Sequence, residues 1–169
     1  MQKINKFRPS TLLQLPQNLK WTLGVCCALL SAILLGSAYG KLFHPSEELI
    51  WLDFGASLLE LGVIFALLRY QIQPQLWGGL ALLFAAWGGY SLYWLRLELP
   101  CKCMGDMIEF PTYLSFSLDV TFFVFSLAFA TLLGAKRHTV YLQAIAGFFL
   151  ALVGFASGEW VFEHLLMEF

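Results

Sequence analysis

Five apolar runs, each about twenty residues long, follow one another along the chain and are separated by short polar breaks. About 20 mostly apolar residues are enough for an α-helix to cross the hydrocarbon core of a bilayer. The sequence therefore predicts an all-α, polytopic membrane bundle of five transmembrane helices, with four spans and one peripheral helix as the variant. The predicted spans are residues 21–40, 49–68, 76–95, 116–135 and 140–161.

The composition agrees with a lipid bilayer as the solvent of this chain. Mean hydropathy is +0.72, and charged residues make up 12% of the chain, whereas an ordinary soluble domain has about 25%. We expect one transmembrane domain at residues 21–161, a cytoplasmic segment at residues 1–20 and a periplasmic tail at residues 162–169. Because so little chain lies outside the spans, neither a separate catalytic domain nor nucleic acid as a partner is expected.

The positive charges predict the orientation of the bundle. Lys and Arg are enriched in the cytoplasmic loops of membrane proteins. With a cytoplasmic N-terminus, seven of the ten cations lie inside and three outside, so we predict an N-in, C-out topology. The inner cations are Lys3, Lys6, Arg8, Lys20, Arg69, Lys136 and Arg137, and the outer ones are Lys41, Arg96 and Lys102.

Small residues and tryptophans suggest how the spans pack and where they end. Glycines let helix backbones approach closely in a membrane, and indoles favour the headgroup region. We expect a packing role for Gly36 with Gly40, Gly154 with Gly158, Gly78-Gly79 and Gly88-Gly89. We expect headgroup contact for Trp21, Trp51, Trp77, Trp94 and Trp160, whereas Trp87 is in the middle of a span.

The four cysteines form two pairs in different surroundings. Cys26 and Cys27 are inside the first span, where a thiol acts as a small apolar filler. Cys101 and Cys103 belong to the third loop, which the predicted topology places in an oxidising compartment. Lys102 between them favours the reactive thiolate, and Gly105 relieves the backbone after the turn.

Two residues spaced as Cys101 and Cys103 are can form a strained disulfide. Strained, exposed disulfides have high reduction potentials and tend to be the exchange-active ones. The spacing therefore predicts a redox-active turn, and it leaves open a static disulfide that only holds the loop. Copper(I) binding is a third interpretation, because thiolates and thioethers suit this ion; its ligands would be Cys101, Cys103, Met104 and Met107.

Glu60 is an acidic residue within the second predicted span. An ionisable side chain inside the membrane is energetically costly, so such a residue usually pairs with another charged group and often has a function. Lys41 ends the first span and reaches Glu60 if the second helix begins nearer Phe54 than Leu49. This pair either fixes two helices together or serves a proton or quinone role, while Asp119 either joins the cluster or faces water.

Three motifs occur in order along the chain: residues 37–45 (Ser-Ala-Tyr-Gly-Lys-Leu-Phe-His-Pro), residues 59–62 (Leu-Glu-Leu-Gly) and residues 101–105 (Cys-Lys-Cys-Met-Gly). Together they resemble the MauE branch (methylamine utilisation) of the DoxX-like membrane protein family. The resemblance covers roughly residues 20–160. Met104 departs from the family's loop, which commonly has phenylalanine at this position.

The resemblance implies a helical bundle in the bacterial inner membrane that serves the maturation of disulfide-rich periplasmic proteins. Cys101 and Cys103 would take the positions of the family's cysteine pair, facing the periplasm and exchanging with a thioredoxin-like protein. Other DoxX-like relatives include a subunit of a thiosulfate and quinone oxidoreductase, which leaves quinone as a candidate electron acceptor; no cofactor follows from the residues themselves. The alternatives are a non-catalytic assembly subunit and a copper-handling membrane protein.

Overall fold

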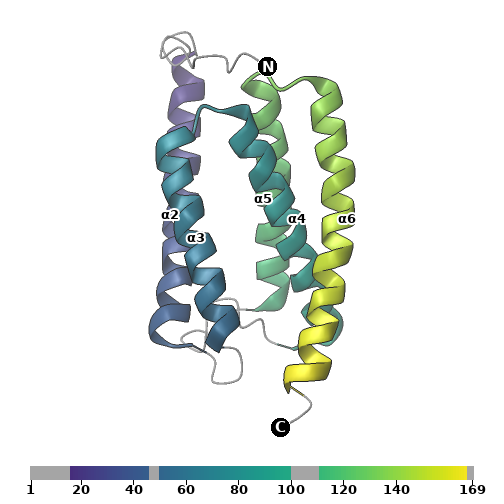
Figure 1. Cartoon of the computed structure of the whole chain (residues 1–169). Helices are drawn as coiled ribbons and strands as arrows, with labels where there is room; N and C mark the ends of the chain where they lie inside the picture. The colour runs from purple at the N-terminus through teal and green to yellow at the C-terminus, as the bar shows by residue number, and fades with distance from the viewer. Residues whose placement is uncertain (1–15, 46–49, 100–110, 167–169) are drawn as a thin grey trace, which may run out of the picture.

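The computed structural model describes residues 16–45, 50–99 and 111–166, which form five long helices and one short helical turn. The five helices confirm the predicted all-α bundle, and Figure 1 shows that successive helices run in opposite directions. The π-helical turn η1 continues the last helix into the predicted tail. The elements are α2 (Gln17–Phe43), α3 (Ile50–Tyr70), α4 (Pro74–Arg96), α5 (Thr112–Leu132), α6 (Arg137–Val161) and η1 (Phe162–Leu166).

Proline and glycine, rather than the edges of the apolar runs, determine where α5 begins and ends. The predicted fourth span, residues 116–135, is displaced by about one turn from the observed helix, Thr112–Leu132. Pro111 precedes the first residue of α5, where its fixed φ angle suits a helix start. Gly134 has a φ angle of +95°, which ends the helix because other residues rarely adopt this conformation.

The helices fall into two groups, a pair formed by α2 and α3 and a trio in which α4 packs against both α5 and α6. The two groups meet through an apolar core near the beginning of α2 and the end of α3, where the Trp77 and Phe129 rings are 4.7 Å apart. Because this core holds one end of the bundle together, the groups can diverge toward the other end. Its buried members are Leu23, Cys27, Leu30, Leu34, Leu67, Trp77, Leu80, Phe84, Phe129 and Ala130.

Four helical segments are long and apolar enough to cross a bilayer: α2, α3, α5 and the segment Arg137–His164, which combines α6 with part of η1. Helix α4 is not among these segments, yet it contains more buried residues than any other helix described. A helix surrounded by other helices needs no lipid-facing apolar surface. The structure is thus that of a multi-pass membrane bundle in which α4 is central rather than peripheral.

The central helix α4 touches α6 through glycines. A Cβ atom on Gly89 would stand 1.9 Å from the carbonyl oxygen of Ala151, and one on Gly154 would stand 2.0 Å from that of Ala86. Backbone atoms of both helices are therefore in direct contact at these positions, as small residues permit in membranes. A Cβ atom on Gly36, by contrast, would meet no described atom within 4 Å, so the packing role expected for Gly36 is absent from the described part of the bundle.

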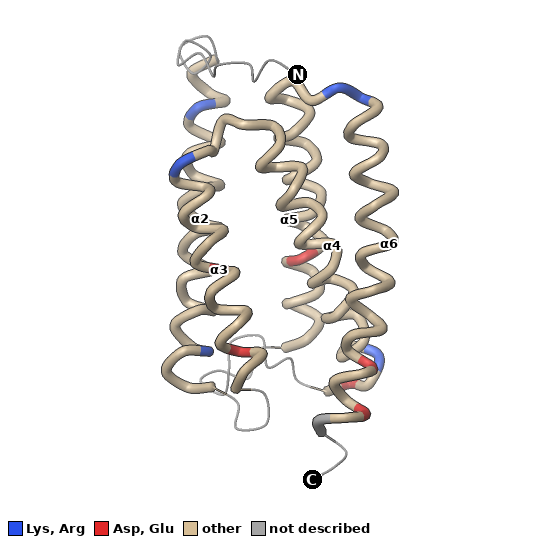
Figure 2. Tube along the Cα trace, in the orientation of Figure 1, with Lys and Arg blue, Asp and Glu red and all other residues tan. Residues whose placement is uncertain are grey.

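Most charged residues lie toward one of the two ends of the bundle, and one acidic segment of α5 lies between the ends (Figure 2). In the described part of the chain, the end that holds the start of α2 carries Lys20, Arg69, Lys136 and Arg137 and no acidic residue. The opposite end carries Asp53, Glu98, Glu159 and Glu163, with Lys41 and Arg96 among them. This division is typical of a membrane protein whose cation-rich end faces the cytoplasm.

Two of the tryptophans expected at the headgroups are instead in the protein interior. Trp77 is 2% exposed, and its indole N–H donates a hydrogen bond to the carbonyl oxygen of Gln71 at 2.7 Å. Trp94 is also buried, against Val161. Trp21, Trp51 and Trp160 are exposed, as an interfacial position requires. The difference arises because both buried indoles belong to α4, which other helices surround.

Candidate functional site

Lys41 of α2 and Glu60 of α3 form a buried ion pair. The Lys41 ammonium (Nζ) lies 2.5 Å from Glu60 Oε1, and both side chains are almost completely shielded. Ser37 completes the group: it donates to Glu60 Oε1 at 2.9 Å and accepts from Lys41 Nζ at 2.8 Å. The pair forms even though α3 begins at Ile50, because α2 continues through Lys41 to Phe43.

A polar stripe runs along the buried face of α3. Asp53, Ser57 and Glu60 are spaced four and three residues apart, so they project from one side of the helix. All three are buried, and the Ser57 hydroxyl donates to the carbonyl oxygen of Asp53 at 2.8 Å. The leucines beside them, such as Leu58 and Leu59, are exposed. Helix α3 is therefore apolar outside and polar inside, as expected for a helix in lipid.

A second polar group joins α4 to α5 within the same half of the bundle. Ser91 donates to Asp119 Oδ2 at 2.7 Å, and the Ser91 and Ser115 hydroxyls are 3.4 Å apart. These residues are buried, and Asp119 is 9% exposed. Thr112, Ser115 and Asp119 repeat at helical spacing along α5. Asp119 therefore points into the protein rather than into water.

Both polar groups face one cavity of about 440 Å³. All five long helices contribute to its wall, and the contributing residues belong to the half of the bundle nearest the acid-bearing end. The wall brings together Lys41, Glu60 and Asp119, which are far apart in sequence, and adds Asp53. Its remaining residues are mostly apolar or aromatic. A volume of this size and a few convergent polar groups are typical of a small-molecule site.

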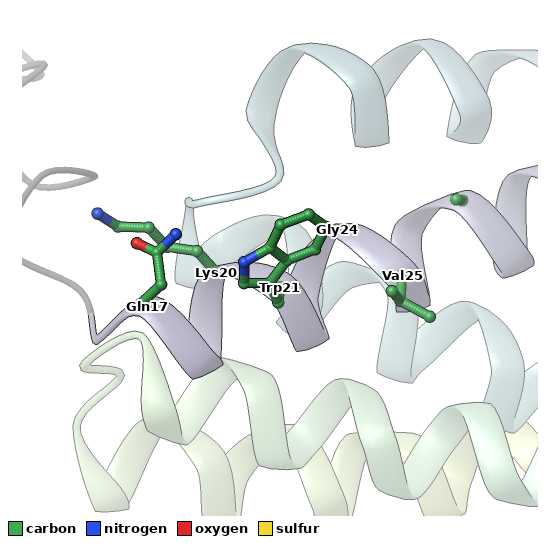
Figure 3. A pocket seen from close by; sticks show the side chains of 6 residues that line it. Gln17, Lys20, Trp21, Gly24 and Val25 are labelled. Carbon is green, nitrogen blue, oxygen red and sulfur yellow. The ribbon is translucent and has the colours of Figure 1, made fainter.

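A second hollow is a shallow feature of the surface. Its volume is about 300 Å³, and every residue that lines it comes from the first three turns of α2 (Figure 3). The exposed Trp21 indole lies over this face, next to Gly24. Because a single helix provides the entire wall, this hollow lacks the enclosure that a specific ligand needs, and the cavity remains the candidate site.

The cysteine pair predicted to carry the chemistry, Cys101 and Cys103, lies outside the described residues, as do Lys102 and Gly105 and the copper alternative through Met104 and Met107. The structure does describe the two ends of this loop. The Thr112 hydroxyl donates a hydrogen bond to the carbonyl oxygen of Leu99, which ties the start of α5 to the end of α4. The loop therefore begins and ends at the acid-bearing end, beside the half that contains the cavity.

The other two cysteines are in the bundle. Cys26 and Cys27 are free thiols; Cys27 is a buried member of the apolar core, and Cys26 packs against it from a partly buried position. These surroundings are those of small apolar side chains. Within the described ranges, no group of three His, Cys, Asp or Glu residues is arranged to hold a metal ion.

Several cavity residues were not anticipated from the sequence. Asp53 and Ser91 were not assigned to any site, yet both line the cavity with Glu60. The spacing of Asp53, Ser57 and Glu60 within an otherwise apolar run is a signal that could have revealed the α3 stripe. Nothing comparable could have shown that Ser91 faces Asp119, because this contact depends on how α4 and α5 pack.

We compared the chain with models of protein families, with curated proteins and with solved structures, and none of them matches it. The resemblance to the MauE branch therefore depends on the sequence motifs. Two of these motifs meet in the structure, since Lys41 of the first contacts Glu60 of the second.

Proposed function

We propose that this protein is a five-span membrane factor for thiol redox or maturation of periplasmic proteins. In this proposal the N-terminus is cytoplasmic, the membrane is the bacterial inner membrane, and Cys101 and Cys103 face the periplasm. The single observation that supports the proposal is where the described residues on either side of the loop, Leu99 and Thr112, lie. Residues 99 and 112, which the Thr112–Leu99 hydrogen bond ties together, lie at the end opposite the described cations Lys20, Arg69, Lys136 and Arg137.

The proposed chemistry is thiol–disulfide exchange between the loop and a thioredoxin-like partner. A partner thiolate attacks the Cys101–Cys103 disulfide and forms a mixed disulfide, and one loop thiolate leaves. The second thiolate of the partner then attacks the mixed disulfide, so the partner ends as a disulfide and the loop as a dithiol. Two electrons have moved from the partner to the loop. They pass with two protons to an acceptor in the membrane, for which the family resemblance suggests a quinone.

Trapping of a covalent partner tests the exchange. With Cys103→Ser, the Cys101 thiolate can attack the disulfide of an oxidised partner, but no Cys103 thiolate is present to complete this reverse exchange. A mixed disulfide with the partner should therefore accumulate on non-reducing gels and disappear with reductant. The double variant Cys101→Ser/Cys103→Ser should lose the adduct and the maturation of client proteins. The matched control is Cys26→Ser/Cys27→Ser, whose thiols belong to the bundle interior and should not matter. Trapping that survives the loss of both loop cysteines would contradict the proposal.

Labelling of intact cells tests the orientation. A membrane-impermeant maleimide should modify reduced Cys101 and Cys103 in spheroplasts and should fail to do so in sealed inverted vesicles, because the loop faces the outside. The Cys26→Ser/Cys27→Ser background restricts labelling to the loop. The reverse pattern, with labelling in inverted vesicles only, would show that the topology is C-in and would remove the oxidising compartment on which the chemistry depends.

A second candidate function, a non-catalytic membrane assembly subunit, is favoured by the Lys41–Glu60 pair. This pair joins α2 to α3 and has the geometry of a structural link. In this alternative the loop binds a partner without exchanging electrons. Alkylation of membranes before and after reductant separates the two functions: a cysteine pair that remains in one redox state during client maturation supports the assembly subunit.

A further inference from the structure

We propose that the cavity binds an amphipathic organic cation, with its ammonium group held by Glu60 and Asp119 and its apolar part directed between α3 and α6 toward the lipid. This site is independent of the cysteine loop and goes beyond the proposed thiol chemistry. Three features of the cavity support it: the charges of its wall, one carboxylate oxygen that lacks a partner, and the aromatic and exposed residues around it.

The charges of the wall favour a positive ligand. Three carboxylates, Asp53, Glu60 and Asp119, line the cavity, while Lys41 is the one cation among its described lining residues. Lys41 is already engaged by Glu60 Oε1 and Ser37. Acidic side chains thus outnumber basic ones on the wall. A cationic ligand complements such a wall better than an anionic ligand does.

One oxygen of Glu60 points to a hydrogen-bond donor as the missing partner. Glu60 is 3% exposed, and in the described part of the chain its Oε2 atom has no hydrogen-bond partner, although Oε1 accepts from both Lys41 and Ser37. A buried carboxylate oxygen without a partner is costly. Because Glu60 lines the cavity, a ligand N–H group placed there can donate to Oε2. A protonated primary amine offers both this donor and the positive charge.

The rest of the wall suits the apolar part of such a ligand. Phe84, Trp87, Tyr90 and Phe122 bring aromatic rings to the cavity. Aromatic faces attract ammonium groups and also provide apolar surface. Two further lining residues, Leu52 of α3 and Val153 of α6, are 47% and 62% exposed. They mark a lateral opening between these helices, through which an alkyl chain can extend into the bilayer.

Calorimetric titration of the purified full-length chain in phosphatidylcholine nanodiscs tests the proposal. The probes are octylammonium, octanol and octanoate, which share one chain length and differ in the head group. Octylammonium should bind saturably, octanol weakly and octanoate not at all. The affinity for octylammonium should fall about tenfold or more in Glu60→Gln and in Asp119→Asn, since each variant removes a charged hydrogen-bond acceptor. The control Glu163→Gln, an exposed carboxylate at the same end of the bundle, should bind like the wild type.

A second variant keeps the test decisive if Glu60→Gln fails to fold. Ala56→Trp places a large ring in the wall of the cavity and leaves the carboxylates and the Lys41–Glu60 pair intact. It should fold and lose saturable octylammonium binding. Equal binding of octanoate and octylammonium, or full affinity in folded Ala56→Trp, would overturn the proposal. Unchanged octylammonium binding in Cys101→Ser/Cys103→Ser would show that the cavity is independent of the thiol chemistry.

Discussion

Lys41→Met is expected to lower the free energy of unfolding by about 3–5 kcal/mol, the largest loss that we predict for a single substitution. The change leaves the Glu60 carboxylate buried at 3% exposure without its cationic partner. Among the described residues, Ser37 is then the one remaining hydrogen-bond donor to Glu60 Oε1, while Oε2 has no partner. Reversible unfolding in mixed micelles, followed by circular dichroism, measures this loss.

A double variant separates the missing ion pair from other effects of the Lys41 substitution. Lys41→Met/Glu60→Gln removes both charges and should recover much of the stability, because a neutral buried amide costs far less than an unpaired carboxylate. Arg96→Met is the matched control: Arg96 is an exposed cation at the same end of the bundle, and its loss should change stability by less than about 0.5 kcal/mol. If Lys41→Met and Arg96→Met have equal effects, the buried pair does not hold α2 to α3.

Alanine at Gly89 or Gly154 is expected to destabilise the bundle by about 3 kcal/mol, at the upper end of the range for overpacking. At both positions the new methyl group would overlap a carbonyl oxygen of the facing helix, at 1.9 Å for Gly89 and 2.0 Å for Gly154. A backbone carbonyl cannot rotate away as a side chain can, so α4 and α6 must separate. The unfolding measurement used for Lys41 reports this loss.

Gly36→Ala and Gly62→Ala are the matched controls for the glycine contacts. A Cβ at either position meets no described atom within 4 Å, so the substitution should not destabilise the protein. It should instead gain up to about 1 kcal/mol, because alanine favours a helix more than glycine does. Losses of similar size at Gly36 and Gly154 would show that a property common to both positions, such as lipid contact, rather than the α4–α6 approach, controls the effect.

The helices themselves could be predicted from the sequence because they depend on local properties. The length of each apolar run is set by the bilayer thickness, and this relation led to five helices near their observed positions. The contact between Lys41 and Glu60 was predictable in part: a short connection makes α2 and α3 antiparallel neighbours. Because Glu60 lies midway along α3, the contact also required α2 to continue past Lys41 to Phe43. The helix start at Thr112 was harder to predict, because an apolar run does not reveal which proline precedes the helix.

Tertiary packing decided which residues share the cavity and which glycines matter. Gly36 and Gly154 are equally small, but only the packing of α4 against α6 makes Gly154 indispensable. Trp77 and Asp119 lie near the ends of the spans predicted from the sequence. Both are nevertheless buried, because neighbouring helices pack over them. Hydropathy along the chain determines that a segment becomes a membrane helix. Except where polar residues mark one face, as on α3, it does not determine which face of that helix meets protein, because the other faces are all apolar enough for lipid.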